Sequence, residues 1–462
     1  MKYPNRTSIN PLPATARPAA ARPARQITPA APAGLAVGAG LLTILYVLIV
    51  YGRLPEILIP IPMLAFAVAV PALGLTLITG GLLRAGQTSA GKMLLVLTAW
   101  LILCIPFSEW PGGSFNLIVR QMWLKSVALY FIIAGNIVTF HQYRKLIYSI
   151  ALSLLLIVAG TAVWGAARMG RLSAGEGLLG NPNDFAVHLL VAAPFLYFIL
   201  QTRGLASFRG LLALGVLAGV LLLVLKTGSR AGLLTMAAFL GYQFFRGTLR
   251  TKIMLSMAAL AGLAILPAVV PQEAWVRYLT IFSDVDQSEY DTRQVEFAQG
   301  SKEARIELLK ESIWITIHNP VFGVGPGMFS QASAEKTEAA GQRARWSQTH
   351  NSFTQIASES GILAGVLYAA LVLLAIRRGW SLNRLARRNP GAKEFSIAAD
   401  VLAQSTVCFV VGAFFGNYAY MMYMPLLVGC AESLHKIAVR ELPVQVPSPV
   451  ASRISPRRVA PH

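Results

Sequence analysis

Charged residues are scarce in this chain of 462 residues: they make up 13% of it, against 55% apolar residues. A soluble domain usually carries roughly 25% charged residues. With so little charge the chain cannot cover a large water-facing surface, so the composition excludes an ordinary soluble protein. Apolar runs of roughly 20 residues recur along the sequence, which is the length that a helix needs to cross a ~30 Å hydrocarbon core. The sequence therefore predicts an all-α polytopic membrane protein.

Cysteine is almost absent as well. The three cysteines, Cys104, Cys408 and Cys430, stand in or beside apolar runs and form no CxxC pair. This spacing excludes a disulfide framework and a thiolate metal site. We interpret the three as small buried side chains.

Acidic residues are half as frequent as basic ones, 20 against 40, which leaves a net charge of +20. Such an excess could indicate a nucleic-acid partner. The basic residues, however, lie in short segments between apolar runs and not on one soluble domain. They are therefore typical of the loops that orient a membrane protein, and we expect no nucleic-acid partner.

Apolar runs define about twelve transmembrane helices. Nine are expected within residues 34–271 and three within residues 351–437, on either side of a long loop at 272–350. The expected spans are 34–52, 57–83, 92–108, 118–141, 146–167, 184–201, 210–226, 231–245, 253–271, 351–376, 396–415 and 418–437. Pro60, Pro62 and Pro71 interrupt the second one and predict a kink or a partly interfacial segment there.

Lysine and arginine counts in the loops predict the orientation, because cytoplasmic loops are enriched in both. With the N-terminus inside, inner segments hold 25 of these residues and outer segments 15, of which eight belong to the loop at 272–350. Long loops translocate regardless of charge. We therefore expect both termini to be cytoplasmic, with a disordered basic tail at 1–33 and a second tail at 438–462. The long loop would then be periplasmic, in a bacterial inner membrane.

The long loop carries eleven of the twenty acidic residues. Ile306, Leu309, Ile313 and Ile317 recur at helical spacing and predict an amphipathic helix from Glu303 to His318. The turn-rich stretch HNPVFGVGPGMF would end that helix. Asp284 and Asp286 form a DxD pair of the kind that binds a metal in enzymes using nucleotide sugars. Nucleotide sugars are absent outside the cytoplasm, so we interpret this pair as a solvated acidic patch.

His350 is the first candidate for chemistry, because it stands where the long loop enters the tenth span. An N-terminal helix position disfavours a charged imidazole and favours nearby anions. A neutral imidazole there could accept a proton from an attacking hydroxyl. The alternative is a histidine that only caps the helix or lies at the interface. Asn351, the next residue, is a candidate for substrate binding.

Arginines at the outer ends of spans are the second candidates. Arg230 lies in the very short turn KTGSRAG between the seventh and eighth spans, where a guanidinium could bind a phosphate through two oxygens. Arg305 lies on the expected loop helix, and Arg120 and Lys125 stand at the outer end of the fourth span. Each could instead extend to the lipid headgroups or to solvent.

The segment GLLGNPNDF opens the sixth span with Asn181, Asn183 and Asp184. Asparagine and aspartate at this place are typical helix caps. The two asparagines are also candidates for glycan or diphosphate binding.

The order of these parts resembles the O-antigen ligase and polymerase family. The resemblance rests on about twelve spans, the GSRAG turn, a long late outer loop with an arginine before HNPVFGVGPGMF, and the pair His350–Asn351 followed by Gly361. It covers roughly residues 170–376. The resemblance implies a membrane-embedded glycosyltransferase that uses neither a nucleotide sugar nor a metal, and we expect it to need no cofactor.

The resemblance implies a glycan donor on undecaprenyl diphosphate. His350 would orient or deprotonate the acceptor hydroxyl, while Arg230 and Arg305 would hold the leaving diphosphate, and attack from the opposite side would invert the anomeric carbon. In ligases the acceptor is a sugar of lipid A-core; in polymerases it is a second carrier-linked repeat. Ala364 replaces the usual Gly, Thr or Tyr of ligases, and GNPNDF resembles a segment of exopolysaccharide polymerases, so both acceptors stay open.

Two other functions stay open. A transporter or flippase would also have many spans, but such proteins usually carry ionisable residues near the bilayer centre and internal repeats. Here Asp400 and Glu432 lie toward span ends, and no repeat is visible. A non-enzymatic scaffold for polysaccharide assembly is the third possibility.

Overall fold

The structure of the chain is a computed structural model that describes residues 33–57, 63–121, 123–168, 170–174, 177–280, 292–339, 341 and 343–442. Several expectations from the sequence fall outside these ranges. They are the tail at 1–32, the tail from 443 onward, Pro60 and Pro62, and the acidic patch with Asp284 and Asp286.

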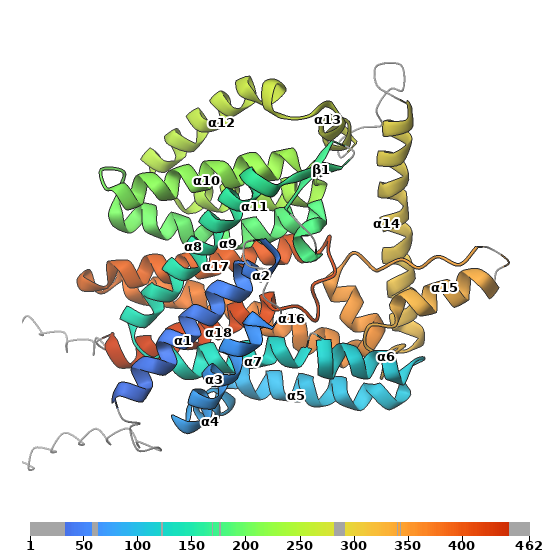
Figure 1. Ribbon diagram of the computed structural model, residues 1–462, viewed down its shortest axis with the longest axis horizontal. Helices are drawn as coiled ribbons and strands as arrows, with labels where there is room; N and C mark the ends of the chain where they lie inside the picture. Colours follow the sequence, from blue (N-terminus) through green and yellow to red (C-terminus); the bar gives the residue numbers. More distant parts are fainter. Residues whose placement is uncertain are drawn as a thin grey trace, which may run out of the picture.

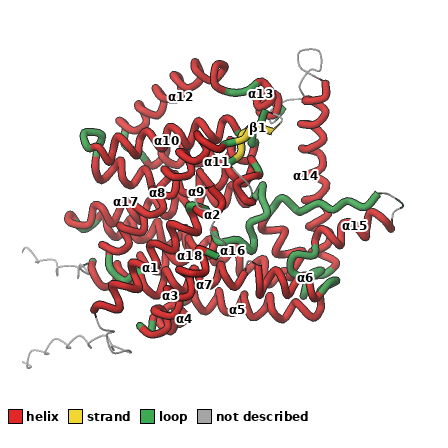
Figure 2. Tube along the Cα trace, viewed as in Figure 1, coloured by secondary structure: helices red, strands yellow, loops and turns green. Residues whose placement is uncertain are grey.

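Helices account for nearly all of the described chain, as Figure 2 shows. The α-helices of the first half are α1 (Ala33–Tyr51), α2 (Leu54–Ile57), α3 (Leu64–Ile78), α4 (Gly81–Gly86), α5 (Ser89–Cys104), α6 (Pro111–Phe115), α7 (Trp123–Asn136), α8 (Phe140–Trp164) and α9 (Pro182–Arg203). Those of the second half are α10 (Phe208–Lys226), α11 (Arg230–Arg246), α12 (Leu249–Val269), α13 (Gln272–Leu279), α14 (Thr292–His318), α15 (Phe329–Ala339), α16 (Ser352–Arg387), α17 (Lys393–Ala413) and α18 (Tyr423–Glu441). A hairpin of β1 (Ala166–Arg168) and β2 (Arg171–Ser173) follows α8.

The expected fold class is confirmed: the described chain is an all-α membrane protein with one two-stranded hairpin. Eight of the described helices are long and apolar enough to cross a membrane by length and composition. Most long helices run side by side in Figure 1, while α14 runs across their direction. The number of twelve spans, and the side of the membrane that each loop faces, stay predictions.

The second expected span, 57–83, is not one helix. It is divided among α2, α3 and α4, and Pro71 lies inside α3. Met63 and Gly80, which precede α3 and α4, both have left-handed backbone angles that end a regular helix. Within the described residues the breaks therefore lie at Met63 and Gly80, whereas Pro71 is accommodated inside α3 and the effect of Pro60 and Pro62 stays a prediction.

Polar side chains at helix starts explain where several spans begin. Thr139 and Gln142 form a capping box at the start of α8, and Ser207 and Ser229 cap α10 and α11. Each cap satisfies a backbone N–H that the first turn of a helix leaves without a partner. Asn351 does the same for α16, where its side chain accepts hydrogen bonds from the N–H groups of Phe353 and Thr354.

The two described chain ends lie on one face of the helix bundle. The N–H of Phe140 at the start of α8 donates to the carboxylate of Glu441 at the end of α18, over 3.1 Å. Gly40 in the first part of α1 approaches the side chain of Gln142 at the start of α8. The hairpin β1–β2, the first residues of α9 and the loop before α16 lie at the other end, on the right in Figure 1. We call this second end the hairpin face.

The expected loop helix is present, but it packs through a different side. It forms the C-terminal part of α14, which begins at Thr292. Leu308 and Ile315 are buried against Val324, Met328 and Phe329 in a small core. Ile306, Ile313 and Ile317, which the sequence pattern placed on the apolar face, are 46%, 46% and 65% exposed. The spacing of apolar residues in the sequence predicted the helix. It did not predict which face of the helix the loop between α14 and α15 would cover.

A break at Gly361 divides α16 into two helical parts. Gly361 has φ 83° and ψ 170°, angles that essentially only glycine adopts. The break leaves backbone carbonyls of the first part without helical partners, and the loop between α14 and α15 satisfies them. Val324 donates to the carbonyl of Ser358 over 3.0 Å and Gly325 to that of Glu359 over 2.9 Å.

Close packing at the break explains the glycines of HNPVFGVGPGMF. A Cβ on Gly361 would lie 1.8 Å from the carbonyl oxygen of Val321. Gly325 has φ 108°, and a Cβ there would lie 1.9 Å from the hydroxyl of Ser108. The loop and the broken helix therefore fit only without side chains at these positions, and together they fix the short helix segment that follows His350.

We predict that Gly361→Ala destabilises the protein by at least about 1–3 kcal/mol, because alanine must adopt a glycine-only conformation and displace the loop. Thermal unfolding of the purified protein in detergent measures this loss. Gly215→Ala is the matched control, since a Cβ on this helical glycine meets nothing within 4 Å. Equal unfolding temperatures for the two variants would contradict the proposed fit.

Candidate active site

The turn between α10 and α11 is surrounded by three arginines. Arg171 on β2 donates to the carbonyl of Thr227 over 3.0 Å, and Arg277 on α13 donates to that of Gly228 over 3.1 Å. Arg230 begins α11 and donates to the hydroxyl of Thr280 over 3.3 Å. The hairpin after α8 and the short helix after α12 thus converge on the turn GSRAG. Segments far apart in the sequence supply these cations to one place on the hairpin face.

Arg230 is unusually buried for an arginine, with 8% of its surface exposed. Its Nη2 atom has no hydrogen-bond partner among the described residues. Burying an unpaired charged donor is unfavourable unless a ligand or water completes its hydrogen bonds. An anionic ligand with oxygen atoms would do so and would match the geometry of a guanidinium.

Arg305 on α14 extends this cluster toward α9 and the segment after α17. The hydroxyl of Tyr418 donates to the carboxylate of Asp184 over 2.9 Å. Burial lowers the pKa of Arg305, whereas the nearby Tyr418 and Asp184 raise it. The four arginines, Arg171, Arg230, Arg277 and Arg305, form what we call the arginine cluster. The carboxylate of Asp184 interacts electrostatically with one member of this cluster, Arg305.

His350 is held in place through its backbone. Its N–H donates to the side-chain carbonyl of Asn417 over 2.8 Å, and the hydroxyl of Thr349 donates to the same oxygen over 2.8 Å. His350 has φ 53°, a left-handed conformation that costs an L-residue roughly 1–2 kcal/mol. Such strain concentrates at functional sites, where the surrounding structure enforces it. Here the hydrogen bonds to Asn417 hold the backbone of His350 in this conformation.

Charges in the site shift its pKa values. Burial, followed by the charges of Arg277 and Arg305, lowers the pKa of Arg171 to about 9. Burial and the charge of Arg305 lower the pKa of His350 to about 4. The imidazole is therefore neutral at pH 7 and can accept a hydrogen bond or a proton, and it lies within the electric field of the arginine cluster.

The remaining predicted residues divide into structural and peripheral positions. Asn181 caps α9, and Asn351 caps α16 with its side chain 6% exposed, so both amide oxygens already have partners. Asn183 accepts a hydrogen bond from Arg171 over 2.9 Å and thereby positions this arginine. Arg120 and Lys125 are exposed and lie over the rings of Phe115 and Phe66. Among the described residues, these two share no hydrogen bond or ring contact with the arginine cluster.

Three site residues were not identified from the sequence. Arg171 and Arg277 lie in short segments without a motif, and only the folding of β2 and α13 onto the GSRAG turn brings them together. Asp184 was interpreted as a helix cap, but Asn181 occupies the cap and leaves the carboxylate of Asp184 to Tyr418. The pair Asn-Asp after a proline was the one available signal, and capping explained it equally well.

Side chains that commonly bind metals are scattered in the described part of the chain. No group of three or more His, Cys, Asp or Glu side chains there could hold a metal ion. The arrangement is a dense set of cations, suited to a multiply charged anion, next to a neutral imidazole and the partly buried carboxylate of Asp184.

Residues 214–369 match the family described as O-antigen ligase. This range contains Arg230, Arg277, Arg305, His350 and the break at Gly361, whereas Arg171 and Asp184 precede it. No curated protein matches the chain.

We predict that inorganic pyrophosphate stabilises the purified protein, because it neutralises the arginine cluster. At a hundredfold excess over its Kd the free energy of unfolding should rise by about 2.7 kcal/mol. Arg305→Gln should remove about 1.5–3 kcal/mol of the binding free energy, the range for hydrogen bonds to charged groups. Thermal unfolding with and without pyrophosphate measures both effects.

Arg345→Gln is the matched control for this prediction. Arg345 is an exposed arginine paired with Glu307 on α14, over 2.8 Å. Its loss should leave the response to pyrophosphate unchanged. A response that Arg305→Gln leaves intact would mean that the anion binds elsewhere.

Proposed function

We propose, on the premise that residues 214–369 place this chain in the O-antigen ligase family, that the protein transfers a glycan from undecaprenyl diphosphate to an acceptor sugar. The family implies an enzyme of the ligase or glycosyltransferase type. The arginine cluster is the observation that supports a lipid-diphosphate donor. The diphosphate of such a donor is a multiply charged anion, which suits a site with four arginines. The chain's apolar helices suit a substrate that stays in the bilayer.

Stabilisation of the leaving diphosphate is the main task that this site can perform. As the bond between the anomeric carbon and the diphosphate oxygen breaks, its electron pair passes to that oxygen and adds negative charge. Arginines that are already in position stabilise such charge without reorganisation, which is usually the largest single contribution to catalysis. Arg230 and Arg305 are the residues we assign to this role, and Arg171 and Arg277 complete the set.

His350 is the group we assign to the acceptor. The oxygen of the attacking hydroxyl forms the new bond to the anomeric carbon. As this bond forms, the hydroxyl gives its proton to the neutral imidazole. A bound diphosphate offsets the charge of Arg305 and so raises the pKa of His350, which makes it a better base in the complex than in the free enzyme. Asp184, also beside Arg305, would orient this arginine through its carboxylate.

The acceptor we propose is a sugar of lipid A-core, as in an O-antigen ligase, without a metal and with inversion at the anomeric carbon. The alternative is a polymerase whose acceptor is a second lipid-linked repeat. Either reaction occurs on the outer face of the inner membrane. This assignment requires the hairpin face to be periplasmic and both termini to be cytoplasmic, as the charge distribution predicts.

The surface glycan of a deletion strain distinguishes these functions. Free core together with accumulated carrier-linked polymer supports the ligase, and core capped with single repeats supports the polymerase. A transporter or flippase would move the lipid-linked glycan across a proteoliposome without any covalent transfer. That result would refute the proposal.

We predict that His350→Ala lowers the rate of glycan transfer about 10²–10⁴-fold through loss of a general base. Arg305→Ala should lower it about 10²–10³-fold through loss of transition-state stabilisation. Transfer to acceptor in reconstituted vesicles measures both rates. Arg345→Ala should keep normal activity, and all variants should insert into the membrane. Full activity of either site variant would remove that residue from the mechanism.

We also predict the pH dependence of kcat/KM, which reports the free enzyme. The active form has a neutral His350, and its pKa of about 4 means that this form persists well below pH 6.5. The value of kcat/KM should therefore stay level as the pH falls from about 8 to about 5 and decline only below that. Arg305→Gln removes a charge that lowers this pKa, so the decline should begin at higher pH. An unchanged profile in this variant would contradict the assignment.

A further inference from the structure

A polar cavity of about 190 Å³ lies at the end of the bundle opposite the hairpin face. It is formed where α9 and α16 end, where α11 passes into α12, and where α17 begins. The residues that line it are Tyr197, Gln201, Gln243, Arg246, Gly247, Thr248, Thr251, Asn383, Arg387, Ser396, Ile397, Asp400 and Val401. It shares no residue with the candidate active site.

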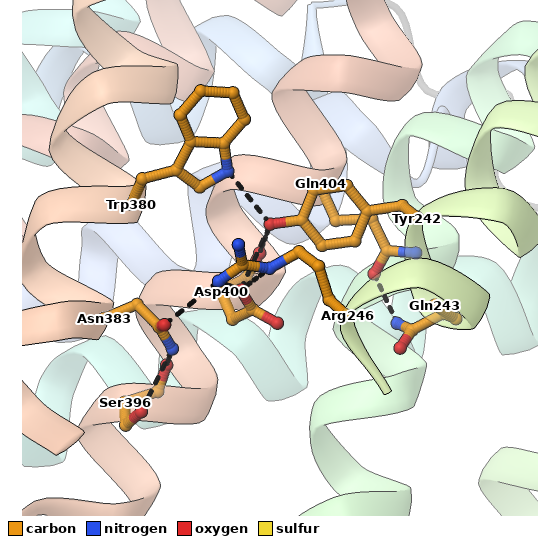
Figure 3. Close-up of polar contacts among 8 residues, drawn as sticks. All are labelled: Tyr242, Gln243, Arg246, Trp380, Asn383, Ser396, Asp400 and Gln404. Atoms are coloured by element: carbon orange, nitrogen blue, oxygen red, sulfur yellow. Dashed lines mark hydrogen bonds and ion pairs between the residues drawn. The ribbon is translucent and has the colours of Figure 1, made fainter. Parts of the chain in front are cut away.

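One wall of this cavity is a hydrogen-bonded network, drawn in Figure 3. The Nε of Arg246 donates to the carboxylate of Asp400 over 2.9 Å, and its Nη2 donates to the side-chain carbonyl of Asn383 over 3.1 Å. The hydroxyl of Tyr242 donates to the same carboxylate oxygen over 3.1 Å and accepts from Trp380. The network joins α11, α16 and α17 and fixes the guanidinium of Arg246 in one orientation.

The charge of Asp400 is largely satisfied by this network. Arg246 pairs with it, and the remaining nitrogen of this arginine, Nη1, has no partner among the described residues (Figure 3). The other ionised side chain of the lining is Arg387, near the end of α16. The ionised lining therefore carries two positive charges and one negative charge. The cavity has room for an anion and a net positive charge to attract it.

The start of α12 contributes a further preference for anions. Gly247, Thr248 and Thr251 line the cavity, and α12 begins at Leu249. The N–H of Thr251 is capped by the hydroxyl of Thr248 over 3.3 Å. The remaining N–H groups of the first turn and the helix dipole favour a negative group at this position. The hydroxyls of Thr248 and Thr251 hydrogen-bond to each other over 3.1 Å at this place.

Exposed apolar residues continue from the cavity along the same helices. Phe245, beside Arg246, is 81% exposed, and Leu249 and Ile253 on α12 are 73% and 52% exposed. Exposed apolar side chains beside a charged cavity are suited to contact the acyl chains of a lipid whose headgroup occupies that cavity. A ligand with a charged head and apolar tails therefore fits both parts of the site, whereas a free phosphate would use only the cavity.

We propose that this cavity binds the phosphate headgroup of an anionic phospholipid from the leaflet opposite the candidate active site. Basic pockets between membrane helices commonly recognise such headgroups. The phosphate would lie between Arg387, the Nη1 atom of Arg246 and the first turn of α12. The acyl chains would then follow Phe245 and the exposed face of α12. Occupancy would join the ends of α11, α12 and α16 and thus stabilise the bundle.

Native mass spectrometry of the full chain in detergent tests the proposal with phosphatidylglycerol, phosphatidylcholine and inorganic phosphate as probes. We expect phosphatidylglycerol to be retained and to raise the unfolding temperature, and the other two to have little effect. Arg387→Gln should weaken retention about fivefold, the effect of one basic residue near a lipid surface. Arg384→Gln, an exposed arginine on the same helix outside the cavity, should change retention less than twofold.

Two results would overturn the proposal. Equal retention in the Arg387→Gln and Arg384→Gln variants would show that lipid binds through diffuse surface charge. Competition by inorganic phosphate at the same concentration as the lipid would show that the site recognises a soluble anion. Unfolding temperatures in phosphatidylcholine serve as the folding control, since neither exposed arginine should affect them.

Discussion

The burial of several arginines beside one turn is the constraint on which the candidate site depends. A guanidinium keeps its charge under nearly all conditions, so the protein cannot relieve the repulsion by losing a proton. Backbone carbonyls of Thr227 and Gly228 accept hydrogen bonds from Arg171 and Arg277, but carbonyl dipoles cannot neutralise four positive charges. Asp184 offers one negative charge. In the proposed function the diphosphate of the donor would supply further negative charge, and its attraction to the cluster would contribute to binding and to stabilising the leaving group.

The break in α16 gives the site its rigidity. A continuous helix could not present His350 at its start and also accept the loop 319–328 against its side. At Gly361 the helix opens, and the carbonyls that lose their helical partners bind the N–H groups of that loop. The same loop covers the small core of Leu308 and Ile315 and thereby holds α14, which carries Arg305. His350 and Arg305 are thus fixed by one packed unit, although 45 residues separate them in the sequence.

The two ends of the bundle use cations differently. At the hairpin face the carboxylate of Asp184 lies near Arg305 of the arginine cluster, for which we propose an anionic ligand. At the opposite end Arg246 pairs with Asp400 and Arg378 with Glu432, so these charges mainly join helices. Such pairs at the membrane surface stabilise only if their remaining hydrogen bonds are satisfied. Asn383 accepts a hydrogen bond from Arg246, and Tyr242, which itself accepts one from Trp380, donates to Asp400.

The class of the protein, most of its helices and three residues of the candidate site could be predicted from the amino-acid sequence. Long apolar runs must be helices in a bilayer, since every backbone polar group needs an internal partner there. Arg230, Arg305 and His350 were identifiable because each lies next to a recognisable segment. That Arg171 and Arg277 lie beside these three residues became apparent only in the folded chain. The same holds for the capping of α16 by Asn351 and for the packing of α14 through Leu308 and Ile315. Contacts between distant segments depend on how side chains of different helices fit together, and no local periodicity or spacing contains that information.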